Sequence, residues 1–143
     1  MIYQELTNLP KLSVAENIFL GVLPKSTIPG VVNFRELYAK TREYFDHFQI
    51  EIDAKAKLSS LTVAEKQFVE IIKAITAKNA RIVIMDEPTS SLTKDEIERL
   101  FSIIRELKQQ GATIIYISHR LDEIVRIADR VSIFRDGKNR GTA

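Results

Sequence analysis

Two adjacent carboxylates follow a short apolar run and precede a proline. Residues 82–85 are all apolar, and Asp86, Glu87 and Pro88 come directly after them. An apolar run without polar alternation is typical of a strand buried on both faces, as in parallel sheets. Ligands of such sheets lie beyond the carboxyl ends of the strands. Asp86 could therefore help to hold a phosphate-bound metal, and Glu87 could orient or deprotonate a water. The alternative is a pair of loop acids satisfied by helix caps and solvent.

A histidine follows a second apolar run in the same way. His119 comes directly after residues 113–117 and Ser118. Parallel pairing of the two runs would bring His119 to the edge that carries the two acids, where an imidazole could contact a terminal phosphate. The alternative is a solvated loop histidine. The other histidine, His47, falls near the end of a predicted helix and is assigned no role.

The start of a predicted helix offers weaker evidence for an anion site. Thr62, Val63, Ala64 and Glu65 stand at this helix start, and a helix N-terminus has backbone N–H groups free to bind an anion. The alternative is simply a well-capped helix. Gln4 carries no signal by itself.

Composition limits the classes of protein to which the chain can belong. The 143 residues are enough for one domain with a core, and 45% hydrophobic residues are ordinary for a globular protein. The balance of 21 basic against 19 acidic residues is too even to indicate a nucleic-acid or acidic-membrane partner. The chain has no cysteine, which suits the cytoplasm and excludes disulfides and thiolate metal sites. No signal peptide is apparent, and no apolar run approaches the roughly 20 residues that span a bilayer.

Helical patterns dominate the first half of the chain, and strand patterns enter near residue 80. A β-α-β-α-β order in the second half predicts parallel strands with right-handed crossovers, and therefore an α/β fold. An Asp-Gly turn follows the last strand. The predicted helices are 14–20 (with a Ser13/Glu16 capping box), 34–48 (capped by Asn33), 62–75 (capped by Thr62), 94–109 (with a Thr93/Glu96 capping box) and 121–128, and the predicted strands are 82–86, 113–117 and 131–135.

One expected phosphate-binding element is missing from the printed sequence. The P-loop pattern Gly-x-x-x-x-Gly-Lys-Ser/Thr needs a specific spacing of glycines. The five glycines stand at positions 21, 30, 111, 137 and 141, and none begins that pattern.

Taken in order, these segments resemble the nucleotide-binding domain of ATP-binding cassette (ABC) transporters. The resemblance implies a partial P-loop NTPase core of the ABC type, with a parallel sheet and a helical subdomain. Residues 1–78 would hold the Q-loop and the helical subdomain, and residues 79–143 the C-terminal part of the RecA-like core. The Walker A strand and loop would lie before Met1. The matching segments are 3–6 (Q-loop), 61–65 (signature motif), 82–87 (Walker B), 90–93 (D-loop) and His119 (switch histidine).

A finer resemblance is to the subfamily that imports simple sugars such as ribose, galactose and xylose. Residues 15–21, 85–93 and 116–124 are similar to that pattern. The resemblance implies an ATPase that couples ATP hydrolysis to carbohydrate uptake. It does not identify the sugar, because specificity lies in the binding protein and the permease.

The family supplies roles for individual residues and implies ATP and Mg²⁺ as cofactors. Asp86 would support Mg²⁺, Glu87 would be the general base, and His119 would contact the γ-phosphate. Gln4 would contact Mg²⁺ or the attacking water. Thr62, Val63, Ala64 and Glu65 would meet the nucleotide held by an opposing domain, and Ser91 would lie along that interface.

The signature segment departs from the family pattern. It reads Leu-Thr-Val-Ala-Glu, whereas the family has Leu-Ser-Gly-Gly-Gln. Val63 would hinder close backbone approach, and the acid at Glu65 would repel a phosphate.

The resemblance also implies partners and a location. The partners would be a second ABC nucleotide-binding domain, membrane permease subunits and, indirectly, a periplasmic or extracellular sugar-binding protein, with no nucleic acid. The chain would lie at the cytoplasmic face of the plasma membrane. Alternatives are a non-catalytic permease-docking remnant or regulator, and a soluble ABC ATPase of translation or DNA repair, against which the absence of cysteine speaks.

The missing strand has a structural consequence in this family. The Walker A strand lies between the strand that precedes His119 and the strand at 131–135. Without it, unpaired strand edges favour aggregation. We therefore expect this chain alone to be poorly folded and inactive as an ATPase.

Overall fold

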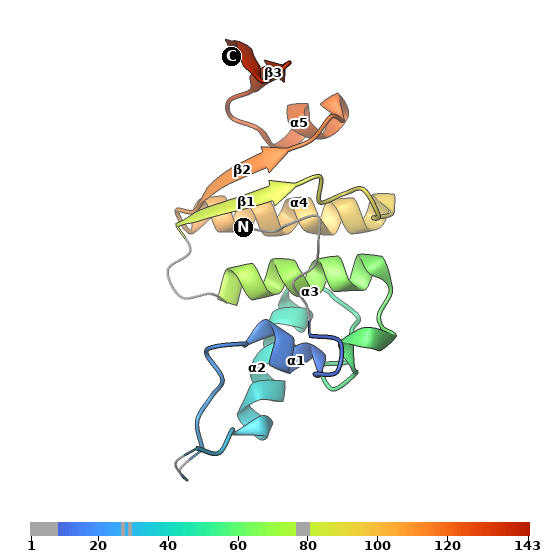
Figure 1. Ribbon diagram of the computed structural model, residues 1–143, viewed down its shortest axis with the longest axis vertical. Helices are drawn as coiled ribbons and strands as arrows, with labels where there is room; N and C mark the ends of the chain where they lie inside the picture. The colour runs from blue at the N-terminus through green and yellow to red at the C-terminus, as the bar shows by residue number, and fades with distance from the viewer. Residues whose placement is uncertain (1–8, 27, 29, 77–80) are drawn as a thin grey trace.

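The computed structural model describes residues 9–26, 28, 30–76 and 81–143. Figure 1 shows a helical part at one end, a central layer formed by a long helix and two strands, and a hairpin at the other end. Among the described residues, no helix is long and apolar enough to cross a membrane. The elements are α1 (Val14–Ile18), α2 (Phe34–His47), the 3₁₀ turn η1 (Leu58–Ser60), α3 (Val63–Thr76), β1 (Ile82–Asp86), α4 (Lys94–Gln109), β2 (Thr113–Ile117), α5 (Leu121–Ile127), β3 (Ser132–Arg135) and β4 (Lys138–Thr142).

The predicted capping residues begin their helices as expected. The hydroxyl of Ser13 accepts a hydrogen bond from the backbone N–H of Glu16, and the Glu16 carboxylate accepts one from the Ser13 N–H. The same reciprocal pair forms between Thr93 and Glu96 at α4. Each box satisfies backbone donors that the first helical turn leaves free, so these helix starts are fixed locally.

β1 and β2 form a parallel pair in the predicted order, with α4 as the crossover. The register joins Ile82 to Thr113 and Asp86 to Ile117. The prediction that residues 82–86 are buried on both faces is wrong. Val83 and Met85 are buried, whereas Ile82 is 59% exposed. Among the described residues only one face of this strand is covered, because the helices pack against the sheet from that side.

The third predicted strand does not join the parallel sheet. β3 pairs with β4 as an antiparallel hairpin, and β4 has no counterpart among the predicted strands. The turn prediction is confirmed: Asp136 and Gly137 connect the two strands with positive φ angles of 53° and 69°. These angles match the right-handed twist of the flanking strands, so the turn favours the hairpin by itself.

A single cluster of buried apolar side chains runs from the helical part into the layer with the sheet. It joins α1, α2 and α3 to β1 and α4. The predicted boundary between residues 78 and 79 falls outside the described residues, and the division into two subdomains stays a prediction. The members with no measurable exposure are Val14, Ala15, Leu37, Val69, Ile71, Ile72, Met85, Leu100, Phe101 and Ile103.

The second strand has a free edge beside a groove. Among the described strands, β2 pairs only with β1. A groove of about 460 Å³ lies next to it, lined by residues of β2, by Val131 and by Phe134. The apolar side chains of Ile115 and Ile117 are 46% and 48% exposed. The sheet could therefore accept another strand at this edge.

Candidate functional site

The candidate site lies where the two parallel strands end. Asp86 closes β1 opposite Ile117, the last residue of β2. One residue further on, the backbone N–H of Glu87 donates to the Ile117 carbonyl at 2.9 Å. His119 follows β2 after Ser118, so the predicted acids and the predicted histidine do meet at one edge.

The side chains of Glu87 and His119 are in direct contact. Nδ1 of the imidazole lies 2.8 Å from the Glu87 carboxylate oxygen Oε1. The Glu87 side chain is 35% exposed and that of His119 is 76% exposed, so the pair is open to a ligand from solvent. Glu87 has a φ of +44°, which is uncommon for a residue with a side chain. Backbone strain of this kind gathers at functional sites because the surrounding structure must hold it.

Asp86 lies beside this pair and is half-buried. Within the described part of the chain, its carboxylate has no hydrogen bond or ion pair. The described residues also contain no group of three or more His, Cys, Asp or Glu side chains placed to hold a metal. A hard cation such as Mg²⁺ is commonly held by one or two carboxylates together with phosphate oxygens and water. Asp86 therefore fits a magnesium ligand of that shared kind.

Sequence reasoning missed a buried carboxylate behind the pair. Glu123 of α5 is 1% exposed, and its Oε2 atom accepts hydrogen bonds from Thr89 Oγ1 at 2.9 Å and from the Tyr116 hydroxyl at 2.7 Å. Burial raises the pKa of the Tyr116 phenol above its usual value, and the hydrogen bond to Glu123 raises it further. In the sequence, Glu123 looks like an ordinary acid in the first turn of a helix, where acids are favoured in any case. Its place four residues after His119, next to Asp122, was the available signal.

The segment after Glu87 forms a tight turn. The backbone N–H of Ser90 donates to the Glu87 carbonyl at 3.2 Å, and that of Leu92 donates to the Thr89 carbonyl at 3.2 Å. Ser90 and Ser91 are both exposed at the outside of this turn. Their hydroxyls are accessible to a partner molecule.

The start of α3 makes its hydrogen bonds within its own first turn. Thr62 and Glu65 form a third capping box: the Thr62 N–H donates to Glu65 Oε2 at 2.7 Å, and the Glu65 N–H donates to Thr62 Oγ1 at 3.2 Å. Val63 is 60% exposed. Among the described residues, no hydrogen bond or ion pair links this helix start to Glu87 or His119. The capped-helix interpretation is therefore confirmed as a local structure.

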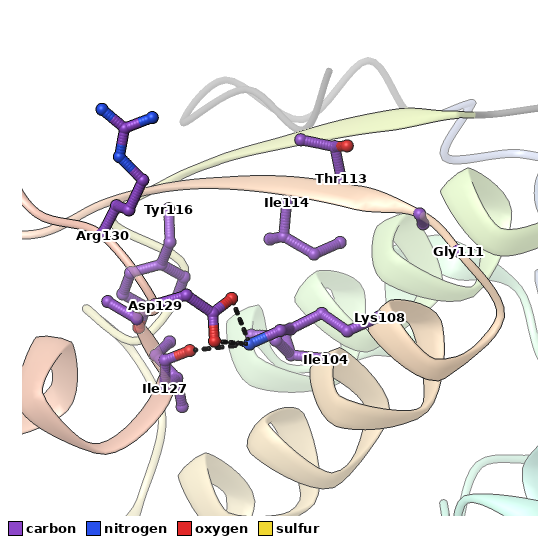
Figure 2. Close-up of a pocket in the computed structure, with 11 residues that line it drawn as sticks. Ile104, Lys108, Gly111, Thr113, Ile114, Tyr116, Ile127, Asp129 and Arg130 are labelled. Carbon is purple, nitrogen blue, oxygen red and sulfur yellow. Dashed lines mark hydrogen bonds and ion pairs between the residues drawn. The ribbon is translucent and has the colours of Figure 1, made fainter.

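A hollow lies near the beginning of β2, and neither Glu87 nor His119 lines it. It has a volume of about 440 Å³ and lies between α4, the beginning of β2 and the link from α5 to β3. Figure 2 shows the Lys108 ammonium inside it, 2.7 Å from the Asp129 carboxylate and 3.3 Å from the Ile127 carbonyl. The Lys108 charge is therefore neutralised, whereas the Arg130 guanidinium, which also lines the hollow, has no ion pair among the described residues.

Comparison with known protein families decides what kind of chain this is. The family model described as ABC transporter matches residues 1–90, which is more than half of the chain. This chain belongs to the ABC transporter family. The match includes both carboxylates at the end of β1 and the exposed turn at Ser90.

Curated proteins similar to this ABC chain align along nearly its whole length. A putative ribose/galactose/methyl galactoside import ATP-binding protein of Geobacillus kaustophilus is 49% identical over 142 residues, which is 99% of this chain and 28% of the relative. The ribose import ATP-binding protein RbsA 3 of Rubrobacter xylanophilus is 54% identical over 138 residues, which is 96% of this chain and 27% of the relative. The chain thus spans a little over a quarter of the length of these relatives.

Solved structures confirm the fold. A dimeric ATP-binding cassette in a post-hydrolysis state, bound to ADP and Pi, superposes with a TM-score of 0.80 at 22% identity. The superposition covers 99% of this chain and 60% of that cassette. A nucleotide-free ATP-binding cassette from an ABC transporter gives a TM-score of 0.74 at 22% identity, covering 99% of this chain and 58% of that one. The ABC-type α/β fold expected from the sequence is therefore correct.

The predicted site residues of this ABC chain fall into three groups. The structure brings Asp86, Glu87 and His119 together at one sheet edge. It places Thr62, Val63, Ala64 and Glu65 at the start of α3, without a hydrogen bond or ion pair to Glu87 or His119 among the described residues, and Ser91 in the exposed turn that follows Glu87. Gln4 lies outside the described residues. The assignment of roles to all of these residues stays a prediction.

Proposed function

We propose that this chain is part of the ATP-binding subunit of an ABC importer for simple sugars. The names of its relatives support ribose or galactose import as the process. The observation that carries the proposal is the 2.8 Å contact between His119 and Glu87 at the carboxyl edge of the parallel strands. A base and a phosphate-sensing group need such closeness to act on the same bond.

In the proposed reaction, each residue of the edge has its own task. Glu87 accepts a proton from the water that attacks the γ-phosphate of ATP. When its ring carries both protons, His119 donates to the Glu87 carboxylate through Nδ1 and can donate to a phosphate oxygen through Nε2. Asp86 would hold Mg²⁺, which when bound neutralises developing charge on the phosphates.

Ser91 and the start of α3 would form the contacts between this chain and a second nucleotide-binding domain. The exposed Ser91 hydroxyl would lie along the interface between domains. The backbone N–H groups of Val63 and Ala64 would meet the nucleotide of the opposing domain, because the capping box takes up those of Thr62 and Glu65. Gln4 would link the site to a membrane permease. Through that permease the chain would sit at the cytoplasmic face of the plasma membrane and act, indirectly, with a sugar-binding protein.

The free edge of β2 supports a place for the phosphate-binding strand. In the family that strand lies between the strand before His119 and the strand at 131–135, and the groove lies between β2 and Phe134. A polypeptide that continues upstream of Met1 would fill the groove with this strand and add the phosphate loop.

The test is ATP hydrolysis by the natural polypeptide that carries this chain, extended upstream through Gly-x-x-x-x-Gly-Lys-Ser/Thr. Glu87→Gln is expected to lower kcat by roughly 10²–10⁴-fold, the usual contribution of general acid–base catalysis, with nucleotide still bound. Glu106→Gln is the matched control. Glu106 lies in α4 and also pairs with a histidine, His47, at 2.8 Å, but it belongs to neither loop at the candidate site. Equal turnover by the wild type and Glu87→Gln would refute the role of Glu87.

A further inference from the structure

The loops that carry Glu87 and His119 meet at one buried carboxylate. Glu123 Oε2 accepts hydrogen bonds from Thr89, two residues after Glu87, and from Ser118, the residue before His119, at 2.9 and 3.3 Å. The Tyr116 hydroxyl donates to the same oxygen at 2.7 Å. One donor from each connecting segment and one from β2 therefore converge on a single atom.

The residue after His119 completes this arrangement. Nη1 of Arg120 lies 2.7 Å from Glu123 Oε1, although this oxygen accepts no hydrogen bond of good geometry among the described residues. We regard the contact as an ion pair that neutralises the buried charge. Both neighbours of His119 in the chain are thus tied to Glu123. The Ser118 hydroxyl also accepts a hydrogen bond from the Arg120 N–H at 3.0 Å, which tightens the turn that presents the imidazole.

A buried acid is costly unless it is fully partnered, and an apolar side chain of similar size would fill this place without that cost. The contacts explain what the acid adds. Thr89 is 3% exposed and Glu123 is 1% exposed, so their hydrogen bond is protected from water. No other described side chain hydrogen-bonds to both connecting segments. Without it, the two loops would be joined only by the exposed Glu87–His119 contact and by backbone bonds.

We propose that Glu123 is a positioning residue that holds His119 against Glu87 by joining the loop after β1 to the loop after β2. The catalytic meaning of this role rests on the proposed function, whereas the geometric claim does not. A positioning role and a merely structural role of Glu123 predict different effects on the contact between His119 and Glu87. A structural acid would change the stability of the fold and leave the imidazole contact as it is.

The experiment measures the ring nitrogen signals of the two histidines by ¹⁵N nuclear magnetic resonance. His119 uses Nδ1 toward Glu87, whereas His47 uses Nε2 toward Glu106, so the two rings have different signatures. The natural polypeptide that carries the chain is labelled at histidine, and the signals are assigned with His119→Asn and His47→Asn. Glu87→Ala defines the signal of a His119 ring that has lost its partner.

Glu123→Leu is expected to move the His119 Nδ1 signal most of the way to its position in Glu87→Ala. Thr89→Val removes a single donor of similar shape and is expected to move it part of the way. Glu98→Gln is the matched control, because Glu98 also pairs with α5, through Arg126 at 2.6 Å, but touches neither loop. It should leave the His119 signal unchanged, and the His47 signal should stay constant in all three variants.

A wild-type His119 signal in folded Glu123→Leu would overturn the proposal. If that variant does not fold, which loss of the His47 signal would reveal, Thr89→Val decides by the same criterion. Turnover gives a second and separate reading: Glu123→Leu is expected to lower kcat for ATP by about 10²-fold with little change in KM. A wild-type polypeptide without ATPase activity would refute the proposed function, and the ring signals would still decide the role of Glu123.

Discussion

The backbone N–H of Glu87 donates to the carbonyl of Ile117 at 2.9 Å. This bond extends the parallel ladder by one residue beyond the last paired position, Asp86. The Glu87 backbone is therefore fixed to the end of β2 even though its φ angle is +44°. The side chain leaves the sheet from a held position, which is what a group that must meet His119 requires.

Loss of the imidazole at position 119 should impair turnover specifically. In the upstream-extended polypeptide, His119→Asn is expected to lower kcat by about 10²-fold or more, because Glu87 loses its partner and the phosphate loses a donor. His47→Asn removes the other imidazole–carboxylate pair, and we expect normal turnover. Steady-state ATPase assays on the two variants decide the matter, and equal effects of both would contradict a specific role for His119.

Two capping boxes allow stability to be separated from function. Thr62 and Ser13 make the same reciprocal bonds with Glu65 and Glu16. Thr62→Ala and Ser13→Ala should each lower the free energy of unfolding by about 1 kcal/mol, as measured with urea. Only Thr62→Ala should also reduce ATPase activity, because only that helix start is proposed to meet a nucleotide. If Ser13→Ala reduced activity equally, the signature role would be unnecessary.

Tyr116 should make the fold sensitive to alkaline pH. Its folded-state pKa is raised above the ordinary 10.0, chiefly by burial and then by the Glu123 hydrogen bond. The stability contributed by the neutral phenol is therefore complete below pH 10 and decreases as the pH rises through the range above it, because only the unfolded chain releases the proton there.

Unfolding curves at a series of pH values from about 9 to about 11 test this, given the usual phenol pKa. The free energy of unfolding of the wild type should fall more steeply with pH than that of Tyr116→Phe. The other tyrosines are present in both proteins and cancel. Identical slopes would show that the Tyr116 phenol titrates alike in the folded and unfolded chain.

Asn17 should be an anchor for the loop before α1. It is fully buried, accepts a hydrogen bond from the Leu9 N–H at 2.9 Å, and donates to the carbonyls of Leu9 and Ser13. Asn17→Ala is expected to cost about 2 kcal/mol, because it leaves buried backbone groups without partners. The exposed Asn139 also makes side-chain hydrogen bonds, and Asn139→Ala should cost less than about 0.5 kcal/mol. Equal losses would mean that burial does not set the value of these bonds.

Much of the secondary structure could be predicted because its signals are local. The α4 bounds 94–109 and the strand bounds 82–86 and 113–117 agree with the structure. Capping boxes and runs of apolar residues act within a few positions of the chain, so the sequence displays them directly. The meeting of Glu87 and His119 was likewise predictable, since both follow strands that pair in parallel.

The remaining features depend on what packs where. Periodicity cannot show that one face of β1 is left uncovered by the described residues, because that depends on elements distant in the sequence. The β3–β4 pairing was missed because residues 138–142 are polar and carry little strand signal. Glu123 was missed since a buried acid and a solvated one look alike until Thr89, Tyr116 and Ser118 are seen around it.

The hairpin of β3 and β4 is exposed at every residue, and Ile133 and Phe134 are 61% and 69% accessible. Its shape comes from the turn at Asp136 and Gly137, with no burial to hold it. An exposed strand with apolar side chains is a template for pairing with another chain. We therefore expect this hairpin to favour self-association of the isolated chain at high concentration.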